Sequence, residues 1–141
     1  MTTVIRRFDV ADTDAVASLW AEVFADDPPR NEPRGMIARK LARDPELFWV
    51  ADEPGTGVVG ALMAGYDGVR GWLYHLAVAP GRRRQGIASA LVEHAVSELH
   101  ALGCRKVNLQ VRASNVAVAA LYASLGWTED ESISLGRVLP D

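Results

Sequence analysis

The 141-residue chain is poor in the residues that build disulfides, metal centres and nucleic-acid interfaces. It has one cysteine, Cys104, so no internal disulfide can form. Its three histidines are scattered, so we expect no bound metal. The net charge is −3 and no basic tail is present, which disfavours a nucleic-acid partner because such binding needs a broad basic face.

Long apolar segments are also missing. No run approaches the roughly 20 residues of a transmembrane helix, and the start Met-Thr-Thr-Val-Ile-Arg-Arg has no apolar core of a signal peptide. We therefore expect a cytoplasmic protein without a membrane partner. With 49% hydrophobic and 23% charged residues, and no repeat or linker, the sequence predicts a single domain over residues 1–141.

Hydrophobic periodicity predicts a mixed α/β fold. Apolar residues recur at helical spacing from Val16 to Phe24 and again from Ile87 to Leu102, and Asp67-Gly68 is typical of a hairpin turn. The strand–loop–helix–strand order over 72–111 predicts a right-handed crossover with parallel strands, so the sheet must be mixed. The expected helices cover about 13–24, 34–43, 87–102 and 115–125, and the expected strands cover about 4–8, 47–51, 58–66, 72–78, 106–111 and 132–138.

The stretch from Trp72 to Leu91 joins a strand to a helix start suited to phosphate. The first N–H groups of a helix have no internal acceptor and lie at the positive end of its dipole. Gly86 and Ala88 lack side chains that would keep a diphosphate from the backbone. G-x-x-x-x-G-K-[ST] is absent and no G-x-G-x-x-G follows the first expected strand, which disfavours a nucleotide-binding regulator. A basic surface turn is the structural alternative.

A second informative pair lies on the helix expected at 115–125. Asn115 and Tyr122 are seven residues apart, almost two turns, so they project from one face with Val118 between them. A polar residue and a phenol in this arrangement can line one groove. A helix cap and a core tyrosine explain the same residues equally well.

These stretches carry a resemblance to a known family. Arg83-x-x-Gly86-x-Ala88 resembles the coenzyme A loop of the GCN5-related N-acetyltransferases (GNAT), whose pattern is Gln/Arg-x-x-Gly-x-Gly/Ala, and the two stretches together resemble the family's two coenzyme-binding motifs. Further segments resemble its YpeA-like bacterial branch, so that the likeness covers nearly the whole chain. These are Asp44–Phe48, Gly65–Trp72, Gly103–Arg112, Leu125–Trp127 and Ser134–Gly136.

The resemblance implies a three-layer α/β/α fold whose six- or seven-stranded mixed sheet is splayed between its fourth and fifth strands. It also implies an enzyme that moves an acetyl group from acetyl-CoA, without a metal, to a primary amine of a small molecule or peptide in a ternary complex. A domain of the same fold that binds or senses acyl-CoA without turnover is the alternative. Monomer and homodimer both stay open, as do the identity of the amine and the use of longer acyl groups.

The resemblance further implies roles for individual residues. The backbone of the strand would pair with the pantetheine amides, the loop and helix start would hold the diphosphate, Asn115 would touch the pantetheine arm, and Tyr122 would lie beside the sulfur and protonate the leaving thiolate. The strand residues are Leu76, Ala77 and Val78, and the diphosphate residues are Arg83, Arg84, Gln85, Gly86, Ile87, Ala88 and Ser89.

The general base is less defined. Many relatives carry a glutamate where Tyr74 and His75 stand, and strand alternation predicts that these two point to opposite faces, so that only one enters the cleft. Histidine changes charge near neutral pH, which makes His75 the candidate base. A histidine satisfied within the sheet is the alternative.

Relatives use the first two helices and the loop between them as a substrate wall, so we expect acceptor specificity in these two helices and the loop 26–34, with the hairpin 66–72 opposite. Asp26, Asp27 and Glu32 could attract a cationic amine, although an acidic loop is often just solvated. Cys104 is interpreted as core packing.

Overall fold

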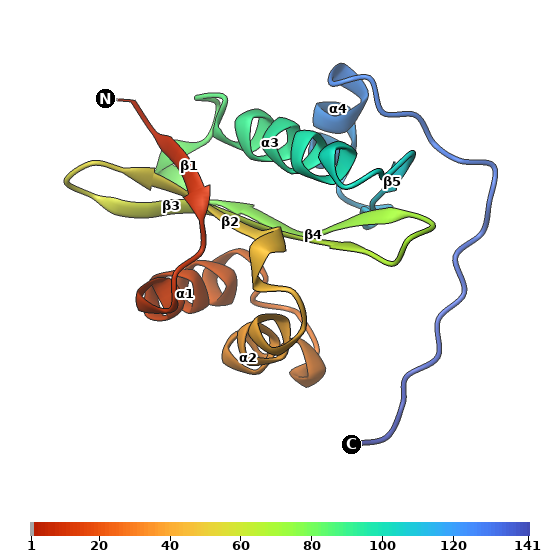
Figure 1. Cartoon of the computed structure of the whole chain (residues 1–141), viewed down its shortest axis with the longest axis horizontal. Coiled ribbons are helices and arrows are strands. Elements are labelled where there is room, and N and C mark those ends of the chain that lie inside the picture. Colours follow the sequence, from red (N-terminus) through yellow and green to blue (C-terminus); the bar gives the residue numbers. More distant parts are fainter. Residues whose placement is uncertain (1) are drawn as a thin grey trace. The chain divides into compact units, whose positions relative to one another are not determined.

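A computed structural model describes residues 2–141 (Figure 1). Its contacts divide the chain into two compact units, one up to Gln110 and one from Val111 onward. The second unit contains α4 (Val116–Ser124). The first unit contains, in chain order, β1 (Val4–Arg7), α1 (Thr13–Val23), α2 (Pro33–Arg43), β2 (Phe48–Glu53), β3 (Gly57–Tyr66), β4 (Gly71–Val78), α3 (Ile87–Ala101) and β5 (Val107–Asn108).

The first unit is a three-layer structure around a mixed sheet. The strand order is β1-β2-β3-β4-β5, with antiparallel pairing throughout except for the parallel pair β4–β5. Helices α1 and α2 cover one face and α3 covers the other (Figure 1). The structure thus confirms the predicted mixed sheet with helices on both faces.

Both faces of the central strands are buried. On the α1 side, Phe48 stacks between Phe8 and Trp20, with ring centroids 4.2 and 5.6 Å away. On the α3 side, a Cβ added to Gly60 would come within 3.0 Å of Leu91, so only glycine allows α3 to pack this closely on β3. Burial on two faces explains why the sequence of these strands does not alternate.

A short turn closed by two aspartates precedes α1. Asp9 accepts a hydrogen bond from the Ala11 N–H, and the Asp12 carboxylate accepts one from the Asp9 N–H, which closes a short 3₁₀ turn ahead of the helix. Asp12 is also paired with Arg6 at 2.8 Å, and this hydrogen bond lowers the pKa of Asp12. The carboxylate therefore ties β1 to the turn instead of capping α1.

Two of the predicted strands are wrong, because one is much shorter in the structure and the other does not form. The strand expected at 106–111 is reduced to Val107–Asn108, and residues 132–138 have no regular secondary structure, so the sheet has five strands where six or seven were predicted. The apolar side chains Ile133 and Leu135 are each 86% exposed. An alternating apolar pattern favours a strand only when its apolar side chains become buried against a neighbour, and these side chains stay exposed. No helix within residues 2–141 is long and apolar enough to span a bilayer.

Candidate functional site

Strand β4 contains a β-bulge at its centre. Ala61 of β3 pairs with Ala77, but Met63 pairs with Tyr74, so three steps along β4 face two steps along β3. His75 lies in the bulge with φ of +54°, a conformation that costs a non-glycine residue about 1–2 kcal/mol. The His75 carbonyl accepts a hydrogen bond from Trp20 Nε1 at 3.0 Å, which holds the bulge against α1.

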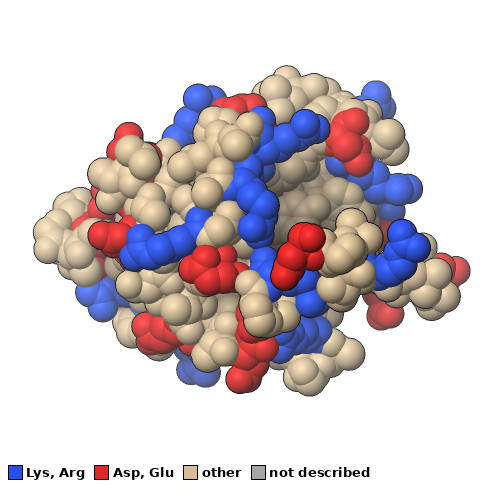
Figure 2. Space-filling view, turned by 90° about the horizontal axis from the view of Figure 1, so that it is seen from below, with Lys and Arg blue, Asp and Glu red and all other residues tan. Residues whose placement is uncertain are grey.

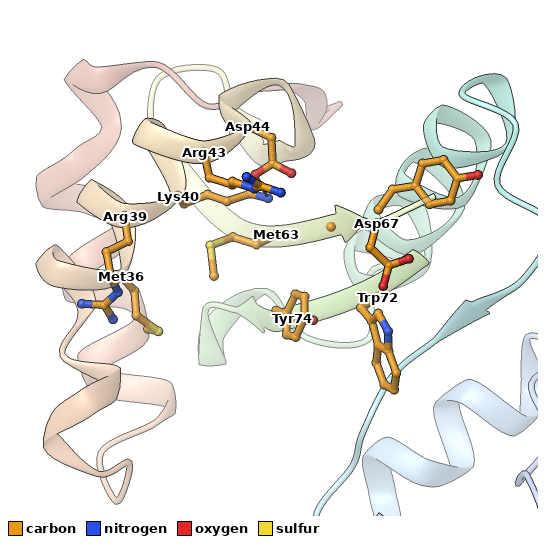
Figure 3. A pocket seen from close by; sticks show the side chains of 11 residues that line it. Met36, Arg39, Lys40, Arg43, Asp44, Met63, Asp67, Trp72 and Tyr74 are labelled. Carbon is orange, nitrogen blue, oxygen red and sulfur yellow. Dashed lines mark hydrogen bonds and ion pairs between the residues drawn. The ribbon is translucent and has the colours of Figure 1, made fainter. Parts of the chain in front are cut away.

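The bulge overturns the expectation that Tyr74 and His75 point to opposite faces. The His75 ring packs edge-on against Trp20 and Phe24 of the α1 segment, with centroids 5.4 and 4.8 Å away. Tyr74 lines a pocket with residues of α2 on the same face (Figure 3). Alternation fails here because the extra residue shifts the strand by one position.

His75 is held by a carboxylate. Its Nε2 lies 3.1 Å from Oδ2 of Asp27, and both side chains are largely buried, at 18% and 14% exposed. Asn31 donates a hydrogen bond to the same oxygen at 3.3 Å. In the neutral tautomer with the proton on Nε2, Asp27 accepts that proton's hydrogen bond and Nδ1 is the basic atom. The contact fits a histidine satisfied by its neighbours and also a base whose tautomer is fixed.

The edge of β4 beyond its first residues is open on the β5 side. Strand β5 pairs only with Gly71 and Trp72, and no other strand of the described residues pairs on that side of β4. The segment Leu76–Val78 is therefore hydrogen-bonded to β3 alone within the sheet. Such an edge can pair with the amides of an extended ligand.

The loop after β4 has the backbone shape of an anion-binding turn. Arg84 and Gly86 both have positive φ, +63° and +79°, and α3 begins directly after them at Ile87. Gly86 is the N-cap and has no side chain to occupy the first N–H groups of α3. A Cβ on Gly86 would meet nothing within 4 Å, so its left-handed conformation is what favours glycine.

One arginine of this loop is structural. Arg82 binds Glu53 of β2 through two nitrogens, with Nε 2.9 Å and Nη2 2.8 Å from Oε2, and this hydrogen bond lowers the pKa of Glu53. The contact anchors the start of the loop to the sheet. Arg83, Arg84 and Gln85 stay exposed beyond the anchor.

The two predicted residues of the helix at 115–125 lie in the second unit. Asn115 caps α4, because its Oδ1 accepts a hydrogen bond from the Val118 N–H at 3.3 Å. Tyr122 is buried, at 7% exposed, with its ring 5.6 Å from that of Trp127. Burial raises the pKa of Tyr122 to about 12, so its phenol keeps its proton at neutral pH. The part that both residues take in a site shared with β4 stays a prediction.

The acidic loop before α2 has structural partners. Glu32 accepts hydrogen bonds from the N–H groups of Arg34 and Gly35, at 3.0 and 2.8 Å, and so caps α2. Asp27 holds His75, as described above. Asp26 is exposed. Two of the three acids expected to attract an amine therefore serve the fold.

A pocket of about 440 Å³ lies between α2 and the hairpin joining β3 to β4 (Figure 3). The hairpin and the second helix, which were both predicted to border the acceptor, line this pocket, whereas the loop 26–34, which was predicted with them, does not. The helical spacing of Met36, Arg39, Lys40 and Arg43 already places these side chains on one side of α2. The lining residues are Met36, Arg39, Lys40, Arg43, Asp44, Met63, Gly65, Tyr66, Asp67, Trp72 and Tyr74. A smaller pocket beside it, of about 280 Å³, is lined in part by Asp27 and His75.

Comparison with known proteins identifies relatives across nearly the whole chain. The family described as "Acetyltransferase (GNAT) family" matches residues 14–127. A protein of Yersinia pestis (strain Pestoides F), named "Acetyltransferase", is 43% identical over 137 residues, which cover 96% of this chain and 94% of that protein.

Solved structures of the same kind superimpose on the chain. The structure titled Ard1 from Thermoplasma volcanium has a TM-score of 0.80 at 25% identity and covers 91% of this chain and 84% of that one. An aminoglycoside acetyltransferase, HMB0005, from an uncultured soil metagenomic sample has a TM-score of 0.74 at 28% identity and covers 100% of this chain and 99% of that one.

The raised pKa of Tyr122 makes a prediction for alkaline solution. A phenol whose pKa is higher in the folded state stabilises the fold fully below its unfolded pKa of 10, and this contribution is lost as pH rises toward about 12. The difference in ultraviolet titration between wild type and Tyr122→Phe should therefore show one phenol ionising well above pH 10. A difference step centred at pH 10 would contradict the burial of Tyr122.

Proposed function

The chain belongs to the acetyltransferase (GNAT) family and is an acyltransferase, and from that premise we propose that it transfers an acetyl group from acetyl-CoA to a primary amine of a small molecule or peptide. One observation carries the proposal. The open edge at Leu76–Val78 runs directly into a left-handed turn and the uncapped start of α3, so a single strand–loop–helix segment offers both partners that coenzyme A needs.

The residues fit the cosubstrate in chemistry. Pantetheine carries two amides, which an open strand edge can bind as an added strand. Its diphosphate suits consecutive backbone N–H groups at a helix start, where no side chain of Gly86 intervenes. We assign the diphosphate to the segment Arg83–Ser89, with Arg82 reserved for Glu53.

The transfer consists of three steps that the protein must promote. The amine must lose a proton, its nitrogen then attacks the thioester carbonyl as the new N–C bond forms, and the C–S bond breaks with the sulfur taking up a proton. Because β5 pairs only with Gly71 and Trp72, a backbone N–H near Leu76 or Val78 on that side of β4 would be available to stabilise the oxyanion. Asn115 would contact the pantetheine arm.

We assign the proton for the thiolate to Tyr122. A phenol is a weaker acid than a thiol in water, with reference pKa values of about 10 and 8.5, so Tyr122 would act as a positioned hydrogen-bond donor. Burial raises the pKa of Tyr122 to about 12, which makes the phenol a still weaker acid and favours the role of hydrogen-bond donor over full proton transfer. We assign the base to His75, with Asp27 fixing its tautomer.

The backbone of Gly86 can be tested by binding. Gly86→Ala forces alanine into a left-handed conformation, at about 1–2 kcal/mol, and the loop should relax away from the ligand geometry. Isothermal titration with acetyl-CoA should show affinity reduced by roughly tenfold. Gly103→Ala is the matched control, since Gly103 follows the other end of α3 with φ of +95° and equally open space. Equal affinity in the two variants would remove the loop from the site.

Tyr122 can be tested by turnover. Tyr122→Phe should lower kcat by roughly 10²–10⁴ while acetyl-CoA affinity stays within about twofold, because only the hydroxyl is lost. The measurement is amine-dependent thiol release over a panel of amines, peptides and polyamines. Unchanged kcat would exclude Tyr122 from the mechanism. Tight binding of acetyl-CoA without thiol release by wild type would instead support the domain that senses acyl-CoA.

His75 can be tested by the pH dependence of the rate. If His75 takes the proton of the amine, His75→Gln should flatten the acid limb of kcat/KM against pH. His94→Gln on α3, whose ring packs against Trp49 instead, is the matched control and should keep that limb. An acid limb that does not change in His75→Gln leaves His75 as a structural partner of Asp27 only.

A further inference from the structure

Helix α2 is strongly basic in a chain of net charge −3. It holds Arg34, Arg39, Lys40 and Arg43 and no acidic residue. Figure 2, which views the molecule from the side of α1 and α2, shows basic side chains gathered in a band over this helix. Three of the four cations, all but Arg34, line the pocket between α2 and the β3–β4 hairpin.

Two of these cations are neutralised by acids. Arg34 pairs with Asp14 at 2.7 Å, outside the pocket. Lys40 pairs with Asp44 at 2.6 Å and also donates to the Ala64 carbonyl. Both groups therefore hold the helix in place and add little net charge to the pocket.

The other two cations form no ion pair within residues 2–141. Arg39 donates one hydrogen bond, from Nη2 to the Arg30 carbonyl at 3.0 Å, and its charge adds to the Gly35 and Arg34 N–H groups in lowering the pKa of Glu32. Arg43 is exposed and forms no hydrogen bond or ion pair within residues 2–141. A guanidinium presents a fork of donors that matches a carboxylate.

The facing wall is aromatic. Trp72 and Tyr74 of β4 line it, with Met63 between them and α2 (Figure 3). Asp67 is the one acid of this wall, and its Oδ1 accepts hydrogen bonds from the N–H groups of Val69 and Arg70, at 2.8 and 2.9 Å. Tyr74 adjoins the bulge at His75, so the aromatic wall leads to the place where the acceptor amine must arrive.

We propose that the acceptor is a small amine that also carries a carboxylate and an apolar group, as an aromatic amino acid does. Its carboxylate binds Arg43, with Arg39 adding positive charge to the pocket, its apolar group packs on Trp72 and Tyr74, and its amine reaches the bulge of β4. The cations also favour the neutral form of a nearby amine, which is the form that attacks. The same charges repel polycationic acceptors. This inference rests on the proposed function.

The test compares ligands that differ in one charge. L-phenylalanine and L-phenylalaninamide have nearly the same shape, and the amide has the less basic amine, so basicity alone would favour the amide. With acetyl-CoA and wild-type protein, kcat/KM for phenylalanine should be roughly tenfold or more higher. Arg43→Gln should reduce that ratio to about twofold or less, and Arg105→Gln, an equal loss of charge outside the pocket, should preserve it.

Binding of the products provides a readout that does not depend on turnover. Titration calorimetry should show the same preference for N-acetyl-L-phenylalanine over its amide, again lost in Arg43→Gln. Equal binding of the two products, or a preference unaffected by Arg43→Gln, would overturn the carboxylate assignment even if amines are acetylated. A preserved binding preference with no turnover of any amine would support the anionic ligand and reject the transferase.

Discussion

The extra residue in β4 is the constraint on which the site depends. The bulge at His75 is held by the hydrogen bond from Trp20 Nε1 to the His75 carbonyl, so packing of α1 on the sheet fixes a strained backbone. The same extra residue turns Tyr74 and His75 to one face and bends the strand where β5 no longer pairs with it. The geometry of the site thus depends on this irregular pairing of β3 with β4.

The elements around this bulge have different roles in the site. Beyond it, the chain passes through the Arg82–Glu53 anchor into the left-handed turn at Gly86 and the start of α3. On the α1 side, Asp27 orients His75, and on the α2 side, Arg39 and Arg43 give the pocket its charge. Of the two acids that line the pocket, Asp44 is paired with Lys40 and Asp67 accepts hydrogen bonds from the N–H groups of Val69 and Arg70. With three cations and two acids, the lining of the pocket carries a net charge opposite in sign to that of the chain.

The sequence predicted the features that depend on local pattern. Helical spacing in α1 and α3, the hairpin at Asp67-Gly68 and the glycine at the start of α3 all act over a few residues, and the structure confirms them. The bulge was not predictable, because a positive φ at a histidine is imposed by Trp20, which lies 55 positions away. The strand expected at 132–138 failed for a related reason, since its alternation finds no burial. The basic pocket wall could have been found from the charge of α2 alone.

The central claim is that one strand–loop–helix segment binds acetyl-CoA through its backbone. Amide hydrogen exchange followed by NMR, with and without acetyl-CoA, tests it most directly. The account predicts that added acetyl-CoA slows exchange at Leu76–Val78 and at Gly86–Ser89 together, while amides of β1 keep their rates. Unchanged exchange in both segments at saturating acetyl-CoA, or protection confined to another part of the chain, would contradict it.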